Sequence, residues 1–272
     1  MARHNMWFGT RERMSWVPCP AINADISHEG WSDSGTYLGG GGYARGSRAA
    51  HKVYGLSWNT ASREEVYSVV DYASGAYGSG LIYFLDPFVA DANVLPEQWS
   101  APGKVDSNGP SLLTTAALPT VANTSTNTIG LPVRTATYTV ANNGKEIWVP
   151  VPPGHALYLG WHGSRTSTGT VQANGAAVTA LAVNSATLTN TIVTPTGGGV
   201  TLRLWGSGQV TIAGLMAQVL PTGSPHPTGR WILGRGHSGC RFQERPKVVG
   251  LSAALDRVSA RATLIETGDW EK

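Results

Sequence analysis

The sequence predicts a mainly β protein: a β-sandwich or barrel domain with one flanking helix, and an inserted jelly-roll or galectin-like β-sandwich. Three observations favour this fold class. Charged residues make up only 14% of the chain, whereas a helical bundle needs many Glu, Lys and Arg residues on its surface. Glycine is abundant, with 34 residues. Short alternating apolar runs are separated by turn signals about every 8–12 residues, as in sandwiches.

The distribution of charge divides the chain into three segments. Residues 1–108 carry eight basic and eleven acidic side chains, and residues 222–272 carry eight and five. Residues 109–221 carry four basic side chains and a single acid, Glu146. Pro and Gly residues mark both junctions. We therefore predict that residues 109–221 are an inserted β-sandwich domain, and that residues 222–272 return to complete the domain begun by residues 1–108.

The first segment begins with two strand patterns. Residues 14–17 are apolar in part and are stopped by Pro18. Residues 52–58 alternate, which places Tyr54, Leu56 and Trp58 on one face of a strand. We expect both runs to be strands of the first domain.

One helix is predicted, over residues 62–74. Ser62 followed by Glu65 has the spacing of a capping box, in which each residue satisfies a backbone N–H of the other. Apolar residues follow at helical spacing, namely Val66, Val69, Val70 and Ala73. Gly75 ends the helix.

The remaining elements are all predicted strands. Residues 81–85 are continuously apolar and end at Asp86, before Pro87. In the middle segment the strand patterns cover residues 133–140, 146–149, 156–161, 200–205 and 209–219. The last run, residues 259–265, alternates, with Ala260, Ala262 and Leu264 on one face. This strand is expected to complete the sheet of the first domain.

The composition argues against several classes of function. The net charge is +3 and the basic residues are scattered, whereas a nucleic-acid-binding protein clusters them on one face. No run of 18 apolar residues predicts a membrane span, and the N-terminal residues lack the apolar stretch of a secretory signal. We therefore expect a protein that is made in the cytoplasm and does not insert into membranes.

The sequence also predicts a protein that is not an enzyme and has no cofactor or metal. Glycoside hydrolysis usually needs two carboxylates, and the middle segment has one. Gly236–Cys240 is close to the Gly-x-Ser-x-Gly motif of serine hydrolases, but Cys240 replaces the last Gly. His237 and Cys240 have the spacing of metal ligands, yet zinc needs three or four protein ligands. We interpret both as ordinary loop residues.

Two smaller features have structural interpretations. Cys19 and Cys240 allow one disulfide, although two free thiols are favoured in a reducing cytoplasm. Gly39–Gly42 lacks the Lys-Ser/Thr pair of a phosphate-binding loop. This run is predicted to be a flexible hairpin tip or hinge, since glycine adopts conformations that other residues avoid.

Trp148, Trp161 and Trp205 are candidate glycan-binding residues of the middle segment. An exposed aromatic ring offers a flat apolar face to a sugar ring. The alternative is that these tryptophans fill the core of the sandwich, as a tryptophan does in immunoglobulin-like domains. The sequence leaves both interpretations open, and core packing is favoured for any single one of them.

Six segments carry a family resemblance: Met6–Met14, Asp71–Gly75, Leu81–Phe88, Asn93–Pro96, Gly236–Phe242 and Glu266–Trp270. They resemble minor tail proteins of long, non-contractile-tailed phages of actinobacteria, and within that group the distal tail proteins. The resemblance covers residues 1–100 and 230–272, and the middle only by fold type. One departure is the domain order, because the second domain of distal tail proteins usually follows the first.

The resemblance implies a structural virion protein of the phage tail tip. Distal tail proteins usually form hexameric rings between the tail tube and the tip hub, with the second domain outside the ring. The implied partners are copies of the chain itself in a homohexamer, the tail tube protein, and the tip hub or other minor tail proteins, with the tape measure protein as a further candidate. DNA would pass through the lumen without specific binding. The alternative function is a carbohydrate- or receptor-binding tail module for attachment to the host cell wall.

A ring closed by head-to-tail contacts needs two different surfaces on each subunit. Arg, Tyr and Trp are enriched at protein interfaces. The candidate interface residues are therefore Trp7, Tyr43, Arg45, Arg48, Trp58 and Tyr67. The alternative for each residue is a position in the core, or on a part of the surface that contacts no partner.

Overall fold

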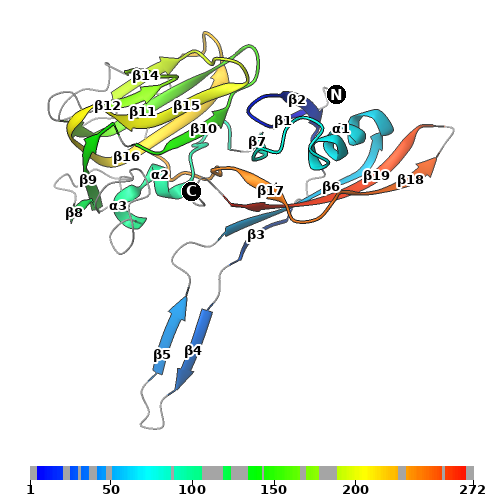
Figure 1. Cartoon of the computed structure of the whole chain (residues 1–272), viewed down its shortest axis with the longest axis horizontal. Coiled ribbons are helices and arrows are strands. Elements are labelled where there is room, and N and C mark those ends of the chain that lie inside the picture. The colour runs from blue at the N-terminus through cyan, green and yellow to red at the C-terminus, as the bar shows by residue number, and fades with distance from the viewer. Residues whose placement is uncertain are drawn as a thin grey trace.

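The computed structural model describes most of the chain: residues 5–20, 25–29, 32–36, 42–46, 51–86, 89–105, 119–123, 134–142, 144–165, 170–177, 189–225, 231–252 and 255–267. The fold is mainly β with several antiparallel sheets, which confirms the predicted fold class. None of the sheets closes into a barrel. Figure 1 shows a sandwich, a smaller body of sheet and helix, and a long arm that extends from the smaller body.

The smaller body, here the sheet module, is built on two long strands. β6 (His51–Ser62) and β19 (Arg257–Glu266) pair antiparallel along almost their whole length. β17 (Cys240–Phe242) and β18 (Lys247–Ser252) pair with the other edge of β19, and β3 (Asp25–Glu29) pairs with the start of β6. The C-terminal segment thus lies in the same sheet as β6, and the sandwich strands lie between the two in the sequence.

The side chains of β19 alternate between the two faces of this sheet, as the sequence predicts. Ala260, Ala262 and Leu264 are buried, whereas Arg261 is exposed. A three-stranded sheet of order β2-β1-β7 belongs to the same body. Its strands are β1 (Asn5–Gly9), β2 (Met14–Pro18) and β7 (Tyr83–Leu85).

Helix α1 (Arg63–Ala73) follows β6 directly and contributes Val66, Val69 and Tyr72 to the core of the sheet module. The predicted capping box is present. The Glu65 carboxylate accepts from the Ser62 backbone N–H at 3.1 Å, and the Ser62 hydroxyl oxygen accepts from the Glu65 backbone N–H at 3.4 Å. The helix begins at Arg63 because these two contacts satisfy N–H groups that have no partner within the helix.

Replacing Glu65 with Ala is expected to lower the free energy of unfolding by about 1 kcal/mol, since it removes half of the capping box. Urea unfolding followed by circular dichroism measures the change. The matched control is Glu64→Ala, because Glu64 lies in the same first turn without a role in the box. The interpretation fails if both variants lose the same stability.

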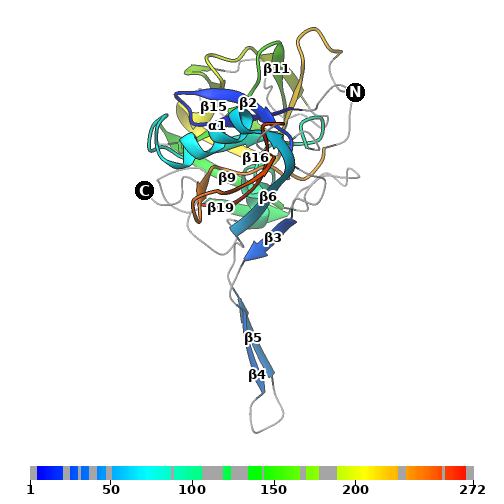
Figure 2. The same ribbon diagram turned by 90° about the vertical axis from the view of Figure 1, so that its right-hand side faces the viewer.

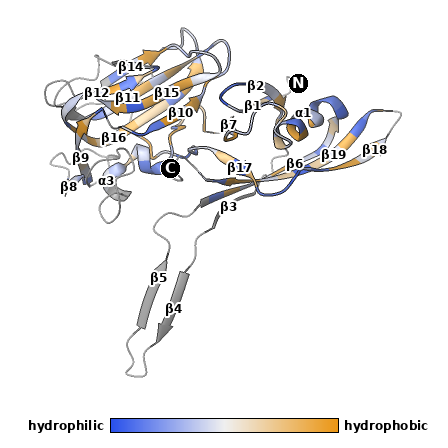
Figure 3. Ribbon diagram, in the orientation of Figure 1, coloured by the Kyte–Doolittle hydropathy of each residue, from blue (hydrophilic) through white to orange (hydrophobic). Residues whose placement is uncertain are grey.

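The sandwich consists of two antiparallel sheets with the orders β10-β15-β12-β13 and β14-β11-β16-β9-β8. Its strands are β8 (Thr120–Asn123), β9 (Arg134–Ala141), β10 (Glu146–Pro150), β11 (His155–Arg165), β12 (Thr170–Ala173), β13 (Ala176–Ala177), β14 (Thr189–Val193), β15 (Gly199–Trp205) and β16 (Ser207–Pro221). Alternate residues of the two sheets, such as Leu157 and Leu159 of β11 and Leu202 of β15, are fully buried against one another. Figure 3 shows hydrophobic residues concentrated in these strands.

The arm consists of β4 (Ser32–Thr36) and β5 (Gly42–Gly46), which pair only with each other. Thr36 and Gly42 are the last register partners. Most of the tetraglycine run lies between them, outside the described residues. The arm extends away from the rest of the molecule in two views at right angles (Figures 1 and 2).

Two segments connect the bodies. The first linker, residues 89–105, contains the short helices α2 (Glu97–Ser100) and α3 (Pro102–Val105). Val94, Leu95 and Trp99 of this linker belong to the same buried cluster as the sandwich core. These residues precede residue 109, where the charge pattern predicts the start of the inserted domain, and Trp7 and Leu85 belong to the same cluster.

Candidate functional site

The sandwich is docked on the sheet module through the outer face of β10. Trp148 alternates along β10 with residues of the sandwich core and is itself buried. Its ring meets the ring of Tyr83 edge-on, with 4.8 Å between centroids. The Trp7 indole N–H donates to the Gly198 carbonyl at 3.2 Å. These contacts pack β10 and its neighbouring turn against β1 and β7.

Charged groups extend the same junction toward solvent. The Arg11 guanidinium lies 5.5 Å from the centre of the Tyr83 ring and 3.9 Å from the Glu146 carboxylate. Glu146 also pairs with Arg203 at 3.2 Å. The single acid of the middle segment therefore joins the sandwich to the sheet module, rather than taking part in a pair of carboxylates.

The two linkers are bonded to each other and to the sandwich. In the first linker, the Val94 N–H donates to the Ala217 carbonyl at 2.9 Å, so this linker extends the sheet beside β16 where β9 has ended. The second linker, residues 231–237, runs alongside it. Its Arg235 N–H donates to the Asn93 carbonyl at 3.0 Å, and its Gly236 N–H to the Leu95 carbonyl at 3.0 Å.

Asn93 is fully buried at the place where the two linkers are hydrogen-bonded to each other. Its side-chain partners are the Ser100 hydroxyl and backbone groups of Leu95, Leu215, Ala217 and Ile232. These partners come from both linkers and from β16. A fully satisfied buried polar network of this kind fixes one arrangement of the groups around it.

The Gly-His-Ser-Gly-Cys segment of the sequence is buried where the second linker meets the sheet module. His237 Nε2 lies 3.0 Å from the Phe84 carbonyl oxygen, and Nδ1 lies 3.6 Å from Cys240 Sγ. Because a carbonyl only accepts, Nε2 carries the proton, and Nδ1 accepts from the thiol. The imidazole is therefore neutral and has a partner on each nitrogen.

Two charged side chains hold the ends of this segment. The Lys52 ammonium group donates to the Arg235 and Gly236 carbonyls at 3.0 and 2.6 Å, and burial lowers its pKa. The Glu266 carboxylate accepts from the backbone N–H and the hydroxyl of Ser238 at 3.0 and 3.2 Å. Lys52 lies in β6 and Glu266 lies in β19. Two adjacent strands of the sheet module therefore hold the second linker by hydrogen bonds.

The protonation of this cluster is opposite to that of a nucleophilic Cys-His pair. Burial raises the pKa of the Cys240 thiol and lowers the pKa of His237 to about 3. An activated pair needs a thiolate beside an imidazolium. The adjoining pocket, lined in part by Tyr54, Trp148 and His237, measures about 20 Å³, room for roughly one water molecule. These groups serve packing and hydrogen bonding.

The candidate interface residues separate into three groups. Trp7 and Trp58 are buried, and the Trp58 indole N–H donates to the Pro18 carbonyl at 2.7 Å. Both side chains therefore belong to the interior of the single chain, which corrects their assignment to a contact between copies. Tyr67 on α1 is 46% exposed and is open to a partner. Tyr43 and Arg45 lie in β5 of the arm, and Arg48 lies outside the described residues.

The candidate glycan-binding tryptophans also differ in environment. Trp161 fills the sandwich core, and Trp148 is covered by the sheet module, so neither offers a ring face to a sugar. Trp205 is partly exposed, and the Arg203 guanidinium covers its ring at 3.9 Å from the centre. Of the three, Trp205 alone retains solvent access, with one ring face occupied by a cation–π contact.

Three exposed apolar side chains that were not predicted lie together among the described residues. Val249, Leu251 and Leu255 are 59%, 53% and 72% exposed, and all three lie in or just after β18. Residues 248–251 contain Val248, Val249 and Leu251 and directly follow Lys247. That run was a usable signal for a strand with an open apolar face.

The residues that the structure describes hold no metal cluster, no membrane-spanning helix and no disulfide. No group of three or more His, Cys, Asp or Glu side chains is arranged to hold a metal ion. No described helix has the length and apolar character needed to cross a bilayer. Cys19 and Cys240 are both free thiols.

No protein-family model, no curated protein and no solved structure matches the chain. The surfaces described above and the resemblance of short segments are therefore the basis for a functional proposal.

Proposed function

We propose that the chain is a structural protein of a phage tail tip, which assembles with copies of itself into a ring between the tail tube and the tip or baseplate. The segments that resemble distal tail proteins support this proposal. The observation that carries it is the arm, which extends from the sheet module into solvent (Figure 2). Among the described residues, the two strands of this ribbon pair only with each other.

The physical argument concerns the stability of a two-stranded ribbon. An isolated hairpin is marginally stable in water, and three strands or a packed face are needed for independent stability. β4 and β5 pair only with each other in the described part of the chain, so both outer edges of the ribbon present unpaired backbone groups. A neighbouring subunit would supply the missing contacts.

The connection between the bodies suits a ring subunit as well. A closed ring needs the same relative orientation of surfaces in every copy. The Asn93 network and the Trp148 contact fix the sandwich on the sheet module. The sandwich would then be held rigidly at the outside of the ring.

Removing the arm is expected to abolish assembly. Glu29 and His51 are register partners, so an Asn-Gly type I′ turn in place of residues 30–50 would close the β3–β6 hairpin without strain. Mass photometry of the intact chain should give particles of about six times 28.7 kDa. The arm-deleted chain should remain monomeric, because it lacks one half of each contact.

The deletion must leave the fold intact for this result to count. The deletion keeps every residue of the two buried clusters, so the thermal midpoint should stay close to that of the intact chain. A monomeric intact chain at micromolar concentration, with no ring in tail-tip images, would contradict the proposal. So would rings formed by the arm-deleted chain.

A further inference from the structure

The sheet built on β6 and β19 is covered on one face and open on the other. α1 packs on the covered face, where β19 buries Ala260 and Leu264. The alternate residues of β19, Ser259, Arg261 and Thr263, point to the opposite side and are exposed or half-exposed. Figure 1 shows α1 over one side of β6 and β19, and no described helix or strand packed on the other side. This second side is here called the open face.

The open face is basic. Lys247 of β18 is the register partner of Arg261, and Arg241 of β17 is the register partner of Ile265. Residues directly opposite each other in an antiparallel pair share a face, so all three cations lie on the open side. Among the described residues Glu244 pairs with Lys247 at 3.1 Å, and no carboxylate pairs with Arg241 or Arg261. Like charges opposite each other destabilise a sheet, so an acidic partner would relieve this face.

The open face also carries apolar side chains. Val249 is the register partner of Ser259 and therefore points to the same side as the cations. Leu251, two residues further on, and Leu255, in the turn toward β19, are exposed as well. A contiguous exposed apolar patch with a polar border marks a contact site in many proteins. The partner that suits this face is thus apolar at its centre and acidic around it.

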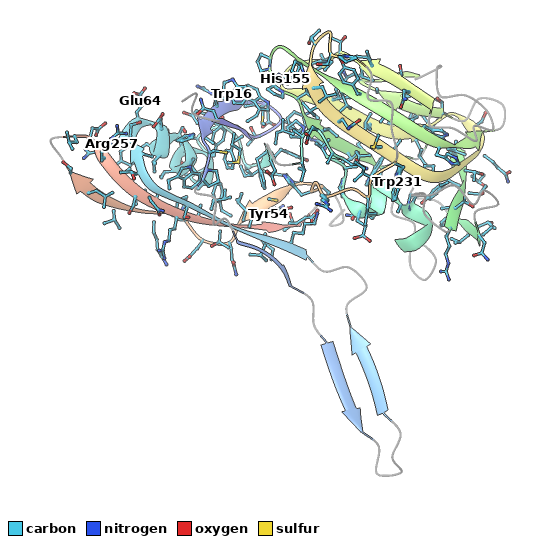
Figure 4. The ribbon with its side chains drawn as sticks, turned by 180° about the vertical axis from the view of Figure 1, so that it is seen from behind. Trp16, Tyr54, Glu64, His155, Trp231 and Arg257 are labelled. Atoms are coloured by element: carbon cyan, nitrogen blue, oxygen red, sulfur yellow. The ribbon has the colours of Figure 1, made fainter. Side chains whose placement is uncertain are left out.

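The solvent side of α1 has this chemistry. Glu64, Tyr67 and Asp71 are spaced by three and four residues, which places them on one stripe of the helix. Ser68 and Ser74 complete the stripe, so it contains no basic residue. Figure 4 shows Glu64 on the side of α1 that is turned away from the sheet. The stripe therefore offers an exposed aromatic ring between two carboxylates.

Among the described residues, the other exposed large apolar side chains lack this acidic border. Outside the β18 region they are Trp16, Ile192 and Ile232. Trp16 follows one acid and one base, so the charges there cancel. Ile192 lies in a run without charged residues, and Ile232 is followed by the base Arg235. Charge complementarity thus selects the stripe around Tyr67.

We propose that α1 of one copy packs on the open face of the next copy. This inference rests on the proposed ring assembly and names a contact within it. Tyr67 would lie against Val249 and Leu251, and the carboxylates of Glu64 and Asp71 would lie beside the cations of the face. The helix is about 16 Å long and β18 about 20 Å, so the stripe fits within the face.

The position of the two surfaces suits a ring. α1 and the open face lie on opposite sides of one sheet, so the contact is head-to-tail and repeats from copy to copy. The arm extends on the side of the sheet opposite α1 in two views at right angles (Figures 1 and 2). A neighbour on the open face would therefore lie on the same side as the arm, whose edges also need a partner.

The test reverses the charges of each half of the contact. The helix variant is Glu64→Lys with Asp71→Lys, and the sheet variant is Lys247→Glu with Arg261→Glu. The four side chains are exposed or half-exposed, so both variants should keep the thermal midpoint close to that of the intact chain. Each variant alone brings like charges together. Its ring population should fall at least about tenfold in mass photometry.

A 1:1 mixture of the two variants gives the decisive result. The basic helix of the helix variant meets the acidic face of the sheet variant, and the acidic helix of the sheet variant meets an unchanged basic face. Rings of alternating copies should therefore form again at the level of the intact chain. The control is Arg134→Glu, which reverses an exposed charge at the start of β9 in the sandwich and should leave rings intact.

Each other outcome overturns the inference. Rings formed by either variant alone would exclude this contact, although the proposed function would stand. A mixture of folded variants that stays monomeric would mean that the open face takes another acidic surface. Loss of rings in Arg134→Glu would mean that ring formation depends on net charge and not on these two surfaces. A monomeric intact chain would remove the proposed function and the inference with it.

Discussion

Replacing Asn93 with Asp is expected to lower the free energy of unfolding by about 4 kcal/mol. The two side chains have nearly the same shape, but the carboxylate has no N–H group. The carbonyl oxygens of Leu215 and Ile232, which now accept from Asn93 Nδ2 at 3.2 and 2.7 Å, would face another oxygen. Both carbonyls would lose the amide donor, and the Leu215 carbonyl would keep the Trp231 indole N–H at 3.3 Å. The new charge would be fully buried with no cation beside it and only the N–H groups of Leu95 and Ala217 as donors.

Urea unfolding gives the size of this effect, and amide hydrogen exchange locates it. Exchange should accelerate in residues 89–105 and 231–237 before it does in the sandwich core, because Asn93 joins these two linkers. The matched control is Asn174→Asp. Asn174 also accepts a backbone hydrogen bond, from Thr201 at 3.0 Å, but it is half-exposed, and water can replace what its amide loses. That change should cost less than about 1 kcal/mol. Equal losses in the two variants would mean that the linker network does not stabilise the fold.

Asn93 also shows where sequence reasoning stops. Its partners at Leu215 and Ile232 lie 122 and 139 residues away in the chain. No local pattern links an asparagine to a carbonyl at that separation. The sequence resemblance drew attention to Asn93–Pro96, but it did not indicate that these residues join the sandwich to the sheet module.

The elements whose structure depends on residues close in the sequence were predicted well. α1 follows from the Ser62–Glu65 spacing and an apolar stripe, and both the helix and the capping box are present. The alternation of β19 places Ala260, Ala262 and Leu264 inside. These predictions succeed because neighbouring residues decide the outcome: the cap fixes where the helix begins, and the pleat fixes which side chains share a face.

The strands of the arm were not predicted from the sequence. β4 has the sequence Ser-Asp-Ser-Gly-Thr, which shows no apolar alternation. Its pairing with β5 is set by proximity to the turn, and only the glycine run indicated a hairpin.

Trp148 is a case in which the local pattern was informative but incomplete. Alternation along β10 separates it correctly from the core residues of that strand, but the sequence cannot show that Tyr83 covers it.

The stability of the protein is expected to fall steeply below pH 6.5 because of His237. Burial lowers the pKa of this imidazole from its ordinary 6.5 to about 3 in the folded chain. Between those values the unfolded chain takes up a proton that the folded chain does not. The free energy of unfolding therefore decreases as pH falls, by about 1.4 kcal/mol per pH unit from this group alone. Between pH 6.5 and 4.5 the loss should be about 2 to 3 kcal/mol.

His237→Gln isolates this contribution. The amide of Gln can still donate to the Phe84 carbonyl, but it does not titrate. The variant should be less stable than the intact chain at pH 7, because it loses the contact with the Cys240 thiol. The informative quantity is the slope of unfolding free energy against pH between 6.5 and 4.5, which should become shallower by about 1.4 kcal/mol per unit.

The control for this slope is His155→Gln, in the sandwich, where the ring contacts the Pro153 carbonyl at an exposed position. It should leave the pH dependence of the intact chain unchanged. An unaltered slope in His237→Gln would contradict the burial argument, because it would require the imidazole to ionise in the folded chain. Ionisation there would place a cation beside the Lys52 ammonium group, in a pocket with room for roughly one water molecule. That arrangement is why the structure favours a neutral His237.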